Sequence, residues 1–153
     1  MDEMASKPGA EGGGGVTPTL IGRLQTRLIL TVVIGLPWTV AVTVIATLFT
    51  DGSYSETLNV TLQALGLILV IGLVLWEPLY HGLQQFRWEK DWPTGLGLLT
   101  AINEGVVVWL LLDAPIGAFL IHFVTTWTLI WFVLHGPLRA VVPRWRYRGG
   151  RFA

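Results

Sequence analysis

Few side chains in this 153-residue chain could do chemistry, and the most unusual of them is a carboxyl inside an apolar run. Glu104 lies near the midpoint of that run, with Asn103 beside it. An ionisable group at the centre of a bilayer costs about 2.5–3.5 kcal/mol on insertion scales, so Glu104 is a candidate functional residue. At that depth we expect it to be protonated, or paired within a helix bundle. Two hypotheses remain open: Glu104 titrates a proton or binds a cation, or it hydrogen-bonds a neighbouring helix.

A second candidate group combines Glu77, His81 and His135. Glu77 and His81 are four residues apart, so they share a helix face if the helix continues through Pro78. His135 ends another apolar run at the same expected depth. The three could form a metal site at the cytoplasmic interface, or His81 and His135 could hold one haem. This spacing matches no strong metal motif, so the metal is unknown, no cofactor is predicted, and hydrogen bonding at the lipid interface is the simpler interpretation.

The composition indicates an all-α membrane protein. The chain is 52% hydrophobic and 13% charged, against roughly 25% charged residues in soluble domains. It has no cysteine, which excludes disulfides, thiolate metal sites and thiol nucleophiles. Apolar runs of about 20 residues predict bilayer-spanning helices. We expect four transmembrane helices in an antiparallel bundle within residues 20–138, with these approximate spans: 28–49, 60–80, 94–112 and 116–134.

The charges predict the topology. Residues 1–19 are rich in Gly, Pro and small polar side chains, so we expect a disordered tail there. Lys and Arg gather near the N-terminus, in the loop 82–93 and in the basic tail 139–153, whereas the loops 50–58 and 113–115 have none. The positive-inside rule therefore predicts a multi-pass protein of the cell (plasma) membrane with both termini cytoplasmic. Topology and anionic lipid already account for the arginines, so no nucleic-acid partner is predicted.

Pro78 allows two structures after the second span. Its missing N–H either kinks a continuing helix or begins a new one. The amphipathic pattern of residues 79–91 favours the second alternative, an interfacial helix in the headgroup layer. Pro37, in the first span, is expected to kink that helix.

Small residues recur every four positions on two of the predicted spans. The first ridge is Thr31, Gly35, Thr39, Thr43 and Thr47, and the second is Gly97, Ala101 and Gly105. Small side chains let helices approach closely, so both ridges are predicted to be packing seams. The first and third spans would then contact each other or a partner.

These observations favour a subunit or scaffold of a larger membrane complex, with the bilayer and other membrane proteins, or further copies of the chain, as partners. No motif typical of an enzyme is present, so an enzymatic role is not the preferred interpretation. One alternative is an oligomeric transport protein coupled to protons or cations through Glu104. Another is metal or haem binding at Glu77, His81 and His135.

Overall fold

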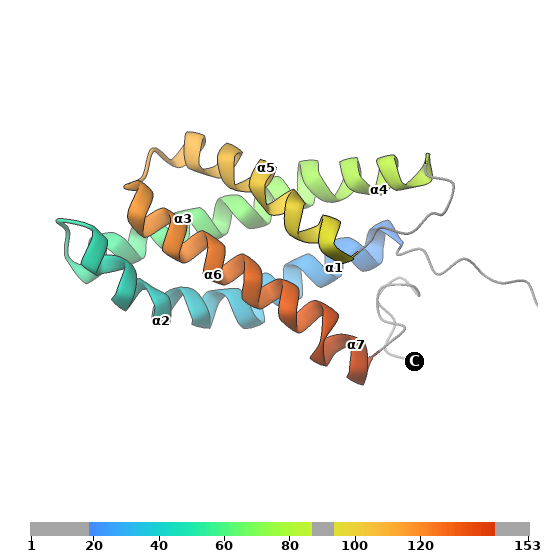
Figure 1. The fold of residues 1–153 in the computed structure, drawn as a ribbon, viewed down its shortest axis with the longest axis horizontal. Helices are drawn as coiled ribbons and strands as arrows, with labels where there is room; N and C mark the ends of the chain where they lie inside the picture. Colours follow the sequence, from blue (N-terminus) through green and yellow to red (C-terminus); the bar gives the residue numbers. More distant parts are fainter. Residues whose placement is uncertain (1–18, 87–93, 143–153) are drawn as a thin grey trace, which may run out of the picture.

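The computed structural model describes residues 19–86 and 94–142, and every element assigned within these ranges is helical. Together they form an antiparallel bundle of four long helices (Figure 1). The first helix comprises α1 (Leu20–Leu30), η1 (Thr31–Gly35), α2 (Leu36–Ala46) and η2 (Thr47–Phe49). The second comprises α3 (Tyr54–Ile71), η3 (Gly72–Trp76) and α4 (Glu77–Gln85). The third is α5 (Thr94–Leu112), and the fourth is α6 (Ile116–His135), followed by the short α7 (Pro137–Val141).

Three of these helices are long and apolar enough to cross a membrane: Leu20–Phe49, Tyr54–Gln85 and Ile116–Val141. The third helix of the bundle has a shorter apolar stretch, Gly97–Leu112. The predicted all-helical class is therefore confirmed for the described residues, and the helices are compatible with a small membrane protein. The fourth crossing remains a prediction.

Both of the first two helices pass a proline without ending. In each, a π turn ends two residues before the proline, at Gly35 before Pro37 and at Trp76 before Pro78. The N–H of Leu36 bonds to the Thr31 carbonyl, five residues back. The wider turn accommodates the hydrogen bond that a proline cannot make. The expected disturbance near Pro37 is thus a π turn within a continuing helix.

A π turn also precedes Pro78, and it contradicts the preferred interpretation that a new helix begins at this proline. The N–H of Glu77 bonds to the Gly72 carbonyl, and α4 continues directly from η3 to Gln85. Residues 79–85 therefore extend the second helix and do not begin a separate one. Residues 87–91 of the predicted interfacial helix lie outside the described residues, and the placement of this end in a headgroup layer remains a prediction.

The ridge of small residues on the first helix packs between the second and fourth helices. Thr43 Oγ1 lies 2.7 Å from Thr61 Oγ1 of α3, and Thr39 Oγ1 lies 2.9 Å from Nε2 of the fully buried His122 of α6. On the third helix, a Cβ placed on Gly105 would lie 2.8 Å from the Phe123 ring of α6. The first ridge is therefore a seam against the second and fourth helices, and the second ridge is a seam against the fourth helix.

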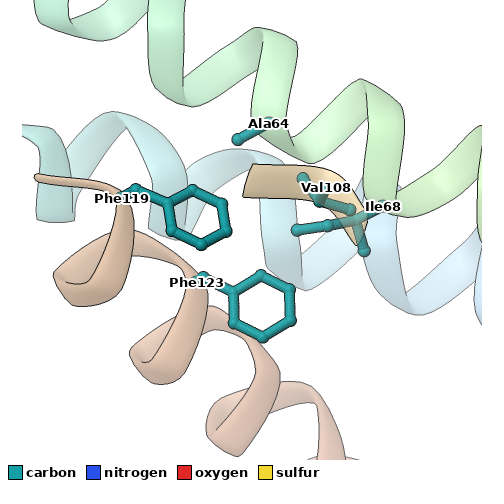
Figure 2. Close-up of a cluster of buried hydrophobic side chains, with 5 residues drawn as sticks. All are labelled: Ala64, Ile68, Val108, Phe119 and Phe123. Atoms are coloured by element: carbon teal, nitrogen blue, oxygen red, sulfur yellow. The ribbon is translucent and has the colours of Figure 1, made fainter. Parts of the chain in front are cut away.

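A small apolar core locks α3, α5 and α6 together. It consists of Ala64, Ile68, Val108, Phe119 and Phe123, which meet where the three helices converge (Figure 2). The two phenyl rings stack with centroids 5.4 Å apart. This core fixes α5 against α3 next to the polar residues described below.

Candidate functional site

Two arginines of α1 lie inside the bundle. The helix begins at Leu20 because the Thr19 hydroxyl caps it, accepting a hydrogen bond from the Gly22 N–H at 3.1 Å. This start precedes the predicted one by two turns. Arg23 and Arg27, which the sequence analysis treated as charges flanking the span, are therefore helical, and Arg23 is only 9% exposed.

Arg23 joins α1 to α4. Its Nη1 donates to Glu77 Oε2 at 3.2 Å, and its Nη2 donates to Gln84 Oε1 at 2.7 Å. Glu77 and Gln84 lie seven residues apart and share a helix face. They can both meet Arg23 because the helix continues through Pro78.

Arg27 joins three helices. Its Nη1 donates to Glu77 Oε1 at 3.2 Å. Its Nη2 donates to the Ile68 carbonyl of α3 at 3.0 Å and to the Glu104 carboxylate of α5. Glu104 is 1% exposed, so the ion pair lies within the protein. We call the five linked side chains the Arg–Glu cluster: Arg23, Arg27, Glu77, Gln84 and Glu104.

Gly72 allows the Arg27 side chain to lie directly against the backbone of the second helix. It opens η3 and is buried. A Cβ placed on Gly72 would overlap the Arg27 guanidinium. Any larger residue at position 72 would therefore force the Arg27 guanidinium to move from its place.

The cluster is electrically balanced. It contains two guanidinium groups and two carboxylates, and each arginine pairs with at least one glutamate. Burying these charges is costly, and pairing with good hydrogen-bond geometry offsets that cost. Within the described residues, Nε of Arg23 and Nε of Arg27 have no acceptor, so the network is balanced in charge without being fully hydrogen-bonded.

The predicted pair Asn103–Glu104 divides between the first and second helices. Glu104 joins the Arg–Glu cluster, as expected for a carboxyl paired inside a bundle. Asn103 is exposed, and its side chain lies near the Tyr80 hydroxyl of α4. Neighbours in the sequence thus face two different helices, the first through Arg27 and the second through Tyr80.

The structure does not assemble the predicted site of Glu77, His81 and His135. Within the described residues, no three His, Asp or Glu side chains are placed to hold a metal ion. The physical reason is that both carboxylate oxygens of Glu77 accept hydrogen bonds from arginines of α1. His135 instead packs on its own helix, with Nδ1 3.0 Å from the Trp131 carbonyl and its ring 5.0 Å from the Trp131 ring.

The roles of Arg23, Arg27 and Gln84 were not predicted from the sequence. A signal for the arginines was available, since both continue the four-residue spacing of the ridge that begins at Thr31. Residues at this spacing share a helix face. Extending the ridge backwards would have placed both arginines on the buried side of the first helix. Gln84 offered no comparable signal, because its burial depends on α4 packing against α1.

Comparison of the chain with protein-family models, with curated proteins and with solved structures finds no match. Function is therefore inferred from two features of the described residues. One is the balanced set of buried charges, and the other is the apolar outer surface of the helices.

Proposed function

We propose that this protein crosses the plasma membrane four times and serves as a helical subunit or scaffold of a larger membrane assembly. The Arg–Glu cluster is the observation that carries the proposal. Its charges pair with one another across three helices, so they hold the bundle together. The surface offered to surroundings is apolar, with Leu48 80% and Leu110 67% exposed. Such side chains suit lipid tails or the helices of another membrane protein.

The distribution of charge supports the orientation. One end of the bundle holds the turn after Phe49 and the turn after Leu112 (left in Figure 1), and carries Asp51, Glu56 and Asp113. Among the described residues, Lys and Arg occur only toward the other end, as Arg23, Arg27 and Arg139. By the positive-inside rule the arginine-bearing end faces the cytoplasm.

The proposal is tested by isolating the protein from its native membranes. A chain tagged after Ala153 should stay with washed membranes, require detergent for release, and co-purify with a stoichiometric partner in mild detergent. Because the chain has no cysteine, Val44→Cys and Leu110→Cys each add a single outward thiol for cross-linking. A matched control is Ala46→Cys, whose thiol is buried in the bundle. Recovery as a lone monomer, with no cross-link from any outward thiol, would overturn the proposal.

Proton- or cation-coupled transport by an oligomer is the second candidate. Its support is that Arg27 is shared by Glu77 and Glu104, so two carboxyl groups from different helices meet at one guanidinium inside the bundle. Glu104→Gln keeps an acceptor for Arg27 but cannot titrate. The subunit proposal expects equal proton and cation flux from the variant and the parent protein in liposomes, with Glu56→Gln, an exposed acid, as the control. A selective loss of flux in Glu104→Gln would assign transport instead.

A further inference from the structure

The outer face of α3 carries two amide side chains. Asn59, Gln63, Gly66 and Val70 are all exposed. At about 100° per residue, these four positions fall within about 60° of one another around the helix. We call them the α3 stripe. No hydrogen bond joins the Gln63 amide to another described residue.

The depth of Gln63 follows from its neighbours on the first helix. Thr43 and Thr61 lie at one level, since their hydroxyl oxygens are 2.7 Å apart. Beyond that level, toward the acidic end, Leu48 is 80% and Phe49 is 56% exposed, so hydrocarbon extends past it. Gln63 lies two residues to the opposite side, about 12 Å from the level of Phe49 at a rise of 1.5 Å per residue. An amide at this depth has no water to bond, and another helix can supply the missing partner.

A groove lies beside the amide. It has a volume of about 200 Å³ and is lined by apolar side chains of η1, α2 and α3, among them Val32, Leu36, Leu62 and Leu69. Gly66 forms part of its wall, and nothing lies within 4 Å of a Cβ placed there. A facing helix can therefore approach the backbone of α3 closely and insert an aliphatic side chain.

We infer that the α3 stripe is the contact surface for a second copy of this chain. Two copies inserted with the same orientation are related by a two-fold axis along the membrane normal, so the same residues meet at the same depth. Glutamine suits such a contact because its amide both donates and accepts. Each Gln63 amide bonds to its counterpart, and the open space over Gly66 lets the two α3 helices approach closely. This inference rests on the proposed membrane placement.

The test uses the purified full-length chain in phosphatidylcholine vesicles. Val70→Cys places a single thiol on the α3 stripe, and Leu110→Cys places one on the exposed face of α5 as the control. Oxidation should give a disulfide-linked dimer from Val70→Cys and little from Leu110→Cys. Adding Gln63→Leu to Val70→Cys should weaken association about three- to tenfold. Gly66→Leu, which fills the groove, should also reduce the dimer. Equal cross-linking at both positions, or no effect of Gln63→Leu, would overturn the inference.

Cross-linking of Val70→Cys in native membranes tests self-association separately from the proposed assembly role. A Val70→Cys thiol that links only to a different protein would overturn self-association and leave the proposed assembly role standing. A self-linked dimer in vesicles that loses linkage in Gln63→Leu supports the inference, even where no other protein co-purifies. Helical circular dichroism of each variant checks that a lost cross-link is not a lost fold.

Discussion

Replacing Arg27 by Met is expected to lower the free energy of unfolding by about 3–5 kcal/mol, because it leaves Glu104 buried without its guanidinium partner. Arg23 still pairs with Glu77 in this variant. The loss therefore arises mainly from one uncompensated carboxylate, together with the hydrogen bond to the Ile68 carbonyl. Denaturant-induced unfolding in mixed micelles, followed by circular dichroism, measures it.

A double variant tests whether the lost stability comes from the unpaired charge of Glu104 or from the missing Arg27 side chain. Arg27→Met combined with Glu104→Leu removes both charges and should recover most of the loss, because a buried ion pair contributes little net stability over apolar residues of similar size. Arg139→Met, at an exposed site on α7, should change stability by less than about 0.5 kcal/mol. Equal destabilisation in the single and double variants would show that the Arg27–Glu104 pairing is not the source of the effect.

The second large effect is expected from a single methyl group. Gly72→Ala places a Cβ where the Arg27 guanidinium lies, so Arg27 must leave its contacts with Ile68 and Glu104. Overpacking and loss of the buried pair together should cost about 2–5 kcal/mol. The same unfolding experiment in mixed micelles measures the change.

Gly82→Ala is the matched control, because it lies on the same continuous helix and a Cβ there meets nothing within 4 Å. It should be neutral or stabilise the protein by up to about 1 kcal/mol, since alanine is the better helix former. In an Arg27→Ala background, which lacks both the overlapping atoms and the ion pair, the cost of Gly72→Ala should largely disappear. A Gly72→Ala protein as stable as its parent would refute the close approach of Arg27 to the second helix.

Local patterns predicted most of the secondary structure. Apolar runs identify the helices because their side chains are most stable out of water, where a helix satisfies the hydrogen bonds of the backbone. The turn Asp113-Ala114-Pro115 separates α5 from α6, and Asp113 there adopts a positive φ of 49°. The four-residue spacing of Thr39 and Thr43 identified the buried face of the first helix, because residues at that spacing share a face. These features depend on neighbouring residues only.

The candidate site depends on contacts that local patterns do not contain. Arg27 meets Glu77 fifty residues away and Glu104 seventy-seven residues away. Whether a terminal arginine flanks a span or enters the bundle depends on carboxylates that other helices bring to it. The π turn at Gly72 lets the second helix continue through Pro78 and also leaves room for Arg27. The effect of Pro78 therefore also depends on a residue of another helix.

The sequence by itself thus determined that the chain forms apolar helices, where most of them turn, and which face of the first helix is buried. Only the tertiary structure decided that Glu77 pairs with arginines and does not join His81 and His135 in a metal site. The reason is electrostatic. A buried carboxylate is most stable beside the nearest available cation. Helix packing determines which cation is nearest, and the spacing of residues within one helix does not predict that packing.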